Sequence, residues 1–494
     1  MDSSFLVFEG PHTHMHVGGT AIFEAAALAG PDGGVDIDRI RTYIKSRLHL
    51  VPRYRQRIAF VPLENRPVWV DDQHFNLNYH VRHACLPHPG DEHQLKRLTG
   101  RIISQQLDRG KPLWEAWIVE GLQGGRFALV LKTHHCMVDG LAGVDLLTAI
   151  LGPSSSQVIH DPPRWVPRPA PGRIELVRDA ALRRASAPLQ LARKLRQALK
   201  QPDRTRAELY RDFAAVLQTV ESALWPPART PLNRPVGPHR RFDWLALDLA
   251  EVKAIKHHLG GTVNDVVLAT ATGAIHRYLR RRHLDLTGLN FRVTIPVNVR
   301  APEEYGTMGN RVSAWLTALP VAECDPLDRY ARVRALTADL KHSKQALGPQ
   351  VLTQAAEWLG PAVLSLGIRL TAWLHPYNLI VSNVPGPQQT FYLLGAPMLE
   401  GFPLVPLFEN QGLAIALLSY AGKLCWGVNA DWDLVPDLHD FIGDIRAAFC
   451  ELRDVSAGRV AGARGGAVEA EGRRPPRPAR ARKQRLEQAH TQAS

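Results

Sequence analysis

The chain has 494 residues, of which 45% are hydrophobic and 22% charged, and this composition excludes a largely disordered protein. Its length predicts two domains, each large enough to bury a core of its own. The formal net charge of +13 comes largely from an Arg/Lys-rich stretch over residues 164–211 and an Arg-rich tail after Ser456. Anionic lipid headgroups, nucleic acid and CoA phosphates would all be attracted to such surfaces, so charge alone selects no partner.

The cysteines and the apolar stretches bear on the cellular compartment. Five cysteines are scattered without a C-x-x-C pair, which favours a reducing compartment and argues against a zinc site. Residues 1–10 lack the basic and long apolar regions of a secretory signal. The best candidate for a spanning helix, residues 362–375, contains Arg369 and is too short to cross about 30 Å of hydrocarbon. We therefore expect a cytoplasmic protein, or one attached peripherally to the inner face of the membrane.

The first third of the chain reads as helices alternating with a buried strand. Apolar residues at helical spacing predict a helix over residues 35–50 and another over residues 95–107. The apolar run at residues 127–131 predicts a buried strand, and a helix over residues 141–150 follows until Gly152 and Pro153. This alternation indicates an α/β layer structure.

A Pro-rich connector and a basic stretch with helically spaced leucines separate this part from a second α/β region. The basic stretch either lies on a membrane surface or forms a helical bridge between two domains. Strands are then predicted over residues 291–300 and 377–387 and in a hairpin around residues 421–423, and a helix begins with Thr262 or Asn264 as its N-cap. The expected domains are an N-terminal domain over 1–152, a connector over 153–238, a C-terminal domain over 239–455 and a basic, disordered tail over 456–494.

The segment KTHHCMVDG, residues 132–140, places His134 and His135 at the end of the predicted strand, with Asp139 and Gly140 after them. Metal binding is the weakest of three interpretations, because adjacent residues on an extended chain point to opposite sides. No H-E-x-x-H motif adds ligands, so we expect no metal. A lone core histidine would be ordinary packing, but two histidines beside Asp and Gly are harder to explain in this way.

The third interpretation makes one of the two histidines a general base. An imidazole with an ordinary pKa of about 6.5 accepts a hydroxyl proton near neutral pH, which contributes roughly 10²- to 10⁴-fold in rate. Strand alternation lets only one of the pair face a given cleft. Asp139 either forms an ion pair that holds the loop or steadies the imidazole, and the spacing does not separate these roles.

A protein nucleophile is not apparent in the sequence. No G-x-S-x-G elbow occurs, and nothing in the sequence shows that Cys136 is activated. The economical mechanism is direct transfer, in which an acceptor alcohol is itself the nucleophile. Such a reaction needs hydrogen-bond donors for the tetrahedral oxyanion, and removing one costs about 2.7 to 4 kcal/mol.

The His-His segment also carries a resemblance to a known family. H-H-x-x-x-D-G at the end of a strand is the signature of the CoA-dependent acyltransferase superfamily. Seven further blocks, in the same order, resemble the bacterial wax ester synthase/diacylglycerol acyltransferases over residues 5–452: HMHVGGTAIFE, LDRGKPLWEAWIVEGL, TPLNRPVGPHRRF, GGTVNDVVLA, PVNVR, GNRVS and VSNVPGP. Seven ordered blocks are a specific signal, whereas the H-H-x-x-x-D-G motif alone is moderately specific.

The resemblance implies roles for the residues of the H-H-x-x-x-D-G motif. The family's catalytic base falls on His135, and support of the loop falls on His134. The family's aspartate, here Asp139, holds the shape of the motif, and Gly140 closes it beside the substrates.

Two further blocks imply substrate-binding residues. Pro112, Leu113 and Trp114 match the family's PLW block, associated with the acyl and alcohol channel, although Leu113 and Trp114 could equally belong to the core. Asn264 and Asp265 match its ND block, which lies near the active site from the second domain. Asn264 is our choice for an oxyanion donor, with an N-cap as the alternative.

The fold that the resemblance implies is α/β, with two chloramphenicol-acetyltransferase-like domains forming a pseudo-dimer around an active-site tunnel. The implied activity is that of an acyl-CoA-dependent diacylglycerol O-acyltransferase, or of a long-chain-alcohol O-fatty-acyltransferase that makes wax esters. Acyl-CoA is then a co-substrate and no cofactor is expected. A membrane surface or lipid droplet is a further expected partner, and nucleic acid is not.

Two alternatives stay open at this point. One is an acyltransferase of the same fold with a different hydroxyl acceptor. The other is a non-catalytic protein that binds lipid or coats lipid droplets. The full set of His135, Asp139, Asn264 and the PLW block argues against the second, because a binding module needs no base.

Overall fold

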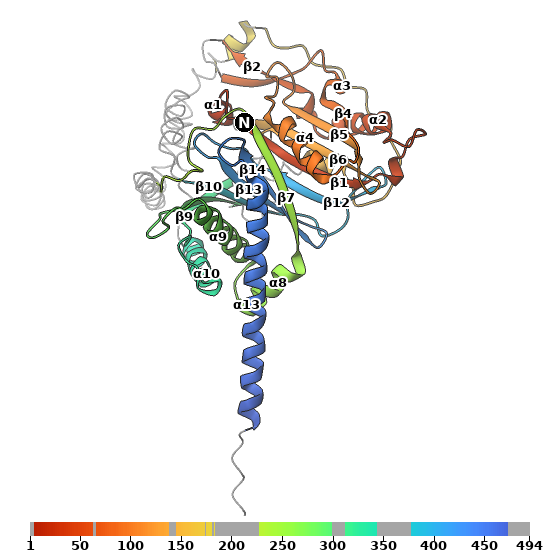
Figure 1. Cartoon of the computed structure of the whole chain (residues 1–494). Coiled ribbons are helices and arrows are strands. Elements are labelled where there is room, and N and C mark those ends of the chain that lie inside the picture. Colours follow the sequence, from red (N-terminus) through yellow and green to blue (C-terminus); the bar gives the residue numbers. More distant parts are fainter. Residues whose placement is uncertain are drawn as a thin grey trace, which may run out of the picture.

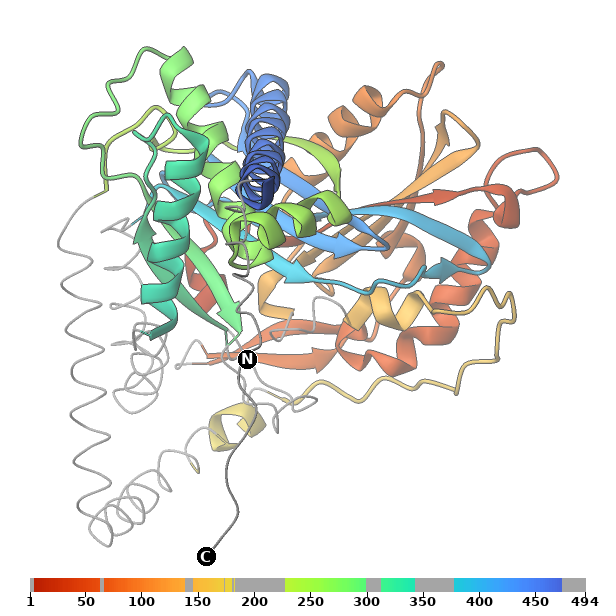
Figure 2. The ribbon, with the colours of Figure 1, turned by 90° about the horizontal axis from the view of Figure 1, so that it is seen from below.

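The computed structural model describes residues 4–62, 66–137, 145–172, 174–179, 182, 227–298, 312–342 and 377–472. Within these residues the chain forms two six-stranded sheets and a separate two-stranded hairpin, with helices on the outside (Figures 1 and 2). None of the helices in these ranges has the length and hydropathy needed to span a membrane. Residues 362–375, the candidate from the sequence, lie outside them.

The first sheet has the strand order β11-β12-β1-β6-β5-β4. Its strands are β1 (His16–Glu24), β4 (Val81–Cys85), β5 (Trp114–Leu122), β6 (Arg126–His134), β11 (Tyr392–Leu393) and β12 (Ala396–Leu404). Neighbours are antiparallel except β4 and β5, which are parallel. A Cβ on Gly18 of β1 would lie 1.9 Å from the carbonyl oxygen of Leu131, so only glycine allows β6 to approach this closely.

Both faces of the first sheet are covered. Alternate residues of β1 and β6 point to opposite sides, so that Phe23 and Leu129 join one buried cluster and Ile22 and Val130 join another. The first cluster includes α2 (Ile37–Arg47), and the second includes α4 (Glu92–Ser104). The smaller elements of this half are α1 (Ser4–Phe8), α3 (Leu77–His80), α5 (Asp145–Ile150), the hairpin strands β2 (Gln56–Val61) and β3 (Arg66–Asp71), and the 3₁₀ turns η1 (Ala26–Leu28), η2 (Leu48–Leu50), η3 (Pro52–Arg55) and η4 (His135–Met137).

The second sheet has the strand order β7-β14-β13-β10-β8-β9. Its strands are β7 (Arg240–Asp248), β8 (Arg292–Asn298), β9 (Val312–Ala318), β10 (Leu379–Pro385), β13 (Leu413–Tyr420) and β14 (Lys423–Asp431). Its helices are α8 (Leu249–Leu259), α9 (Val263–Arg281), α10 (Pro326–His342) and α13 (Leu438–Gly472). These helices lie together over one face of the sheet and bury the largest apolar cluster of the described chain (Figures 1 and 2).

The domain boundaries expected from the sequence need one correction. β11 and β12 lie within residues 239–455 of the chain, yet β12 pairs with β1 and β11 pairs with β12, so both belong to the first sheet. The same β12 crosses over β14 of the second sheet, where a Cβ on Gly427 would lie 1.9 Å from the carbonyl oxygen of Pro403. The first sheet is therefore completed by strands from the second half of the sequence.

The tail expected to be disordered from residue 456 also needs correction. α13 continues to Gly472, and its C-terminal part projects away from the body of the molecule (Figure 1). The sequence from Ala457 to Gly472 contains five alanines but also five glycines, which are poor helix formers. The helix therefore continues here although the local composition does not favour it.

The connector runs along the first half of the molecule where it is described. Arg168 donates from its backbone and its guanidinium to Asp71 of β3 at 3.0 to 3.1 Å. Trp165 lies edge-on to Phe75, with ring centroids 6.1 Å apart. Most of the basic stretch with helically spaced leucines lies outside the described residues.

Most predicted elements that fall within the described residues are present. The helices expected over 35–50 and 95–107 are α2 and α4, although α4 ends at Ser104. The apolar run at 127–131 lies inside β6, and the hairpin around 421–423 joins β13 to β14. The helix expected to start at Thr262 or Asn264 has Thr262 as its N-cap. The expected α/β fold with two related halves is therefore confirmed.

Candidate active site

The two adjacent histidines lie where β6 ends and η4 begins. His134 is the last residue of β6 and is completely buried, whereas His135 opens η4 and is only half-buried. The backbone N–H of His134 donates to the carbonyl of Leu113 at 2.9 Å, and that of His135 donates to the carbonyl of Met15 at 2.8 Å. Successive amides thus bond to different neighbouring segments, and the two rings lie in different environments.

The ring of His134 accepts a hydrogen bond at one nitrogen and lies near a carboxylate with the other. Its Nδ1 accepts from the backbone N–H of Cys136 at 3.1 Å, so the neutral ring carries its proton on Nε2. That Nε2 faces the Oε2 of Glu9 at 3.5 Å. Because neither nitrogen is directed to solvent, His134 supports the turn and has no free position for a substrate proton.

A buried ion pair lies behind His134, and sequence reasoning did not find it. Arg109 donates from Nε and Nη2 to Oε2 of Glu9 at 2.9 and 2.5 Å, and the Glu9 side chain is 1% exposed. Burial by itself raises the pKa of Glu9, but the neighbouring His134 and Arg109 outweigh it and lower that pKa to about 2. Arg109 lies in the block before PLW, but no local pattern links it to Glu9 at the other end of the N-terminal region.

The ring of His135 is covered on one face by α1. The rings of Phe5 and His135 are stacked, with centroids 3.6 Å apart and an interplanar angle of 15°. The N-terminal segment that carries Phe5 and Glu9 thus contacts both histidines. Asp139 and Gly140, which follow in the motif, lie outside the described residues.

Two further histidines lie at the start of β1: His14 precedes the strand and His16 is its first residue. His16 pairs in register with His134 across the sheet, and the rings of His14 and His16 lie 5.4 Å apart. Among the described residues, neither ring nitrogen of His16 has a hydrogen-bond partner. Burial lowers the pKa of His16 well below its usual value, and nearby Lys132 acts in the same direction, so this ring is neutral at neutral pH. In the part of the chain that the structure describes, no group of three or more His, Cys, Asp or Glu residues is arranged to hold a metal ion.

Lys132 connects β6 to the end of α4. Its completely buried ammonium donates to the carbonyls of Ile102 and Gln105 at 3.1 and 2.9 Å and lies 3.2 Å from Oε2 of Glu115. Burial lowers the pKa of Lys132, while Glu115 opposes that change. This lysine of the KTHH segment therefore fixes the approach of β6 to its histidine turn.

The PLW residues are buried beneath the same strand end. Leu113 and Trp114 are completely buried, and the backbone carbonyl of Leu113 accepts from His134. The indole Nε1 of Trp114 donates to the carbonyl of Tyr54 at 2.8 Å, and its ring stacks on His80 at 4.7 Å. Pro112 is also buried. All three residues belong to the packed interior, and a place on a substrate channel stays a prediction.

The ND residues lie on the first turn of α9. Thr262 is the N-cap, so Asn264 is not, and the alternative role named for Asn264 is wrong. Asp265 completes a capping box by accepting from the N–H and hydroxyl of Thr262 at 2.7 and 2.9 Å. Its other oxygen accepts from the hydroxyl of Thr337 in α10 at 2.5 Å. The Asp265 carboxylate thus has structural partners, whereas Asn264 is half-buried on the helix surface.

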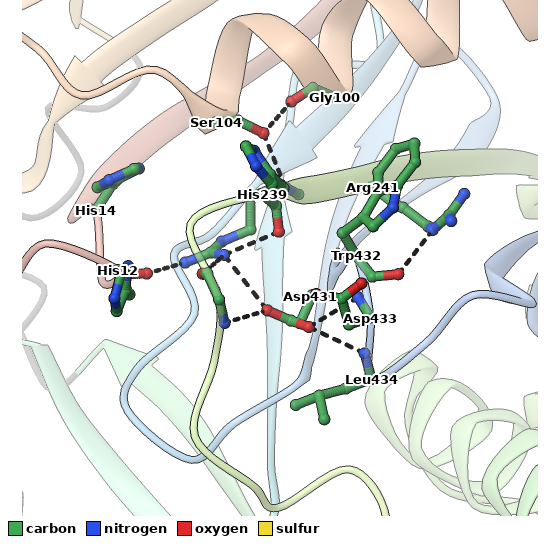
Figure 3. Close-up of polar contacts among 12 residues, drawn as sticks. His12, His14, Gly100, Ser104, His239, Arg241, Asp431, Trp432, Asp433 and Leu434 are labelled. Atoms are coloured by element: carbon green, nitrogen blue, oxygen red, sulfur yellow. Dashed lines mark hydrogen bonds and ion pairs between the residues drawn. The ribbon is translucent and has the colours of Figure 1, made fainter.

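The segment before β1 is anchored to the second half of the molecule by Arg240. Its guanidinium donates to the carbonyl of His12 and to that of Gly237, and it lies 3.7 Å from Oδ2 of Asp431 (Figure 3). Burial lowers the pKa of Arg240 to about 10, and Asp431 opposes this effect. The backbone N–H of Arg240 also donates to the hydroxyl of Ser104 at 2.8 Å. Three segments that are distant in sequence therefore meet at this residue.

The site thus presents one imidazole on a rigidly held backbone. His134, Lys132 and Glu9 are locked by buried partners, and His135 is the half-buried member of the pair. An imidazole placed in this way can accept and return a proton from a bound hydroxyl group.

Comparisons with known proteins assign the chain to a family. The model of the wax ester synthase/diacylglycerol acyltransferase catalytic domain matches residues 1–267, and that of the WS/DGAT C-terminal domain matches residues 308–453. A relative in Mycobacterium tuberculosis, provisionally named a diacylglycerol O-acyltransferase, is 32% identical over 471 residues, covering 92% of this chain and 90% of the relative. One in Mycobacterium bovis with the same kind of name is 29% identical over 471 residues, covering 95% and 98%.

Solved structures show the same fold. The wax ester synthase/diacylglycerol acyltransferase from Marinobacter aquaeolei VT8 superposes with a TM-score of 0.66 at 23% identity, covering 92% of this chain and 99% of that one. The first condensation domain of the CDA synthetase has a TM-score of 0.52 at 16% identity, covering 92% and 94%. From the family models, which together match most of the chain, and from the ordered blocks around His135, the chain belongs to the wax ester synthase/diacylglycerol acyltransferase family of acyltransferases.

Proposed function

We propose that this protein is an acyl-CoA-dependent diacylglycerol O-acyltransferase that forms triacylglycerol and releases CoA. The observation that carries the proposal is the difference in burial and contacts between the two adjacent histidines, His134 and His135. His134 is held by Cys136 and Glu9, and His135 is half-buried at the same strand end. The names of the mycobacterial relatives support diacylglycerol as the acceptor.

In the proposed reaction His135 acts as the general base and no acyl-enzyme forms. The imidazole removes the proton of the acceptor hydroxyl while its oxygen attacks the thioester carbonyl. The new C–O bond forms, the C–S bond then breaks, and the imidazolium returns the proton to the thiolate of CoA. Asn264 is the proposed donor to the oxyanion, which such a step requires.

A direct test uses purified protein with palmitoyl-CoA and diolein. It follows the release of free CoA and the formation of the triacylglycerol with one palmitoyl and two oleoyl chains. His135→Ala is expected to lower turnover by roughly 10²- to 10⁴-fold. The control is His258→Ala, since the His258 side chain is exposed on α8 in the second half of the molecule. Thermal unfolding of both variants should match the wild type. Full activity of His135→Ala would contradict the assignment.

We also propose that long-chain alcohols serve as acceptors, which would give wax esters. The description of the matching catalytic-domain model names both activities and supports this extension. A panel of several acyl-CoAs against diolein and hexadecanol separates the two products. An acceptor of another class is indicated if both are unreactive and a different hydroxyl compound is esterified.

A membrane or lipid-droplet surface is a proposed partner, because both acceptor classes are insoluble in water. Along the connector, Val166, Ile174 and Leu182 are 67%, 87% and 62% exposed, next to several arginines. Apolar side chains beside cationic ones favour an anionic lipid surface. Flotation with phosphatidylglycerol vesicles, compared for the wild type and Ile174→Asp, tests this partner, and equal flotation would exclude the connector as the contact.

A further inference from the structure

The closest ring contact of the candidate base is with Phe5, a residue to which the proposed function assigns no role. The centroids of Phe5 and His135 are 3.6 Å apart at 15°. Neutral aromatic pairs usually have centroids about 4.5 to 7 Å apart, because face-to-face overlap brings negative faces together. A ring that lies directly over a phenyl face at shorter range is more stable there if it is electron-poor, because the phenyl face is negative.

Other stacked histidine pairs in the described chain have wider spacing. His80 stacks on Trp114 at 4.7 Å and 12°, and on Phe75 at 5.2 Å and 14°. The angles are similar to that of the Phe5 and His135 pair, so the difference lies in the separation. His80 has a structural hydrogen bond from Nδ1 to the carbonyl of Trp114 at 2.8 Å and no role in the proposed reaction. The closer stack occurs at the histidine that would become charged.

Phe5 is held in this position from several sides. Arg109 donates to the carbonyl of Leu6 in the middle of α1 at 3.3 Å and to the carboxylate of Glu9, which directly follows α1, and so restrains this short segment. Phe8, one turn on, contacts the edge of Phe408 with centroids 5.6 Å apart. The backbone of His135 is fixed by its bond to Met15. Both members of the stack therefore lie on restrained backbone and do not need to be ordered during reaction.

We propose that Phe5 is a positioning residue that holds the His135 ring and stabilises its protonated form during acyl transfer. The inference rests on the proposed function, in which His135 carries the hydroxyl proton between attack and release of the thiolate. An imidazolium above the negative face of a phenyl ring is attracted to it, as other cations are. Removing that face destabilises the charged intermediate without removing the base.

The other charged or titratable groups on the elements around His135 already have partners or are kept neutral by burial. Those in the described chain are Glu9, Arg109, His14, His16, Lys132 and His134. Replacing Phe5 leaves all of them in place. A change in the protonation of His135 on replacing Phe5 is therefore attributed to the phenyl ring.

The test compares Phe5→Leu, Phe5→Trp and Phe75→Leu in the full-length protein. Phe75→Leu is the matched control, because it makes the same change at a phenyl ring that stacks on another histidine, His80. The readouts are the pH dependence of kcat and kcat/KM with palmitoyl-CoA and diolein, and the protonation midpoint of His135. The midpoint comes from NMR of ring-labelled histidine, with the signal assigned by its loss in His135→Gln, and it does not require turnover.

Phe5→Leu is expected to lower kcat by roughly 2- to 30-fold and to move the acid limb of the profile to lower pH by roughly 0.4 to 1.5 units. The NMR midpoint of His135 should move in the same direction. Phe5→Trp should keep both values near the wild type, because it retains an aromatic face, and Phe75→Leu should keep the midpoint of His135 unchanged.

The inference is overturned if Phe5→Leu leaves the midpoint and profile unchanged, or if Phe5→Trp behaves like Phe5→Leu. If the wild type forms no ester with these substrates, the proposed function fails. The NMR midpoints then decide separately whether Phe5 stabilises the protonated ring.

Discussion

Oε2 of Glu9 lies 3.5 Å from Nε2 of His134, and the same carboxylate accepts two hydrogen bonds from Arg109. The side chains of Glu9 and His134 are 1% and 0% exposed, so the contact is shielded from water. A residue near the start of the chain thereby fixes the ring that precedes the candidate base.

Glu9→Gln is expected to lower the free energy of unfolding by about 1 to 3 kcal/mol, because the buried carboxylate loses its charged hydrogen bonds while Arg109, whose side chain is 38% exposed, stays partly hydrated. The control is Glu92→Gln, since Glu92 is 47% exposed in a surface pair with Lys96 and should change stability by less than about 1 kcal/mol. Urea titrations followed by tryptophan fluorescence measure both. Equal effects of the two substitutions would contradict a structural role for the Glu9 carboxylate.

The contribution of Glu9 should also depend on pH. Burial opposes ionisation, but His134 and Arg109 lower the pKa of Glu9 from 4.5 to about 2. A group whose pKa is lower in the folded state stabilises the protein fully above its unfolded pKa and loses that effect as pH falls. The difference in unfolding free energy between wild type and Glu9→Gln should be constant above roughly pH 5 and shrink toward pH 2. A difference that grows on acidification would refute the sign of this shift.

Arg240→Ala should lower the free energy of unfolding more than Arg241→Ala, although the residues are adjacent. Arg240 is 3% exposed and its loss leaves Asp431, 1% exposed, without its cation, at a cost of about 3 to 5 kcal/mol. Arg241 lies over the ring of Trp432 near the surface, which is worth about 0.5 to 1 kcal/mol. Chemical denaturation of both variants checks the order, and a larger loss for Arg241→Ala would exclude the anchoring role.

Trp114→Phe distinguishes a packing role from a substrate-channel role. It removes the hydrogen bond to the carbonyl of Tyr54 in a buried place, which should cost about 1 to 3 kcal/mol of stability. If the residue serves packing, the relative rates with C12, C16 and C18 acyl-CoA should stay the same. Altered chain-length preference at unchanged stability would assign Trp114 to the channel instead.

Asn264→Ala and Asp265→Ala should affect different quantities: the first should lower kcat, and the second should lower stability. Asp265→Ala removes the capping box of α9 and the bond to Thr337, so stability should fall by about 0.5 to 2 kcal/mol or more. Asn264→Ala should leave stability unchanged and lower kcat by roughly 10²- to 10³-fold if its amide donates to the oxyanion. Unchanged kcat for Asn264→Ala would remove it from the proposed mechanism.

Local sequence patterns predicted much of this molecule. Spacing of apolar residues was enough for α2, α4 and β6, because a helix or strand face is defined by neighbours in sequence. Ordered blocks were enough for the family, and the apolar run before the histidines placed them at a strand end.

Contacts between distant segments could not be predicted in the same way. Nothing near Glu9 indicates that it meets Arg109 and His134, and nothing near β12 indicates that it completes the sheet of the other half. Residues 457–472 show a different failure, since the arginine-rich sequence around and beyond them suggested a disordered tail, whereas α13 continues to Gly472.

Residue types and their order thus account for the elements, the family and the presence of a histidine pair. Folding assigns the roles within the pair, because burial and hydrogen-bond partners depend on which segments pack together. His134 is locked by Glu9 and by the amide of Cys136, while His135 meets the face of Phe5. The chemistry of the site follows from these contacts, two of which are made by side chains near the start of the chain, Glu9 and Phe5.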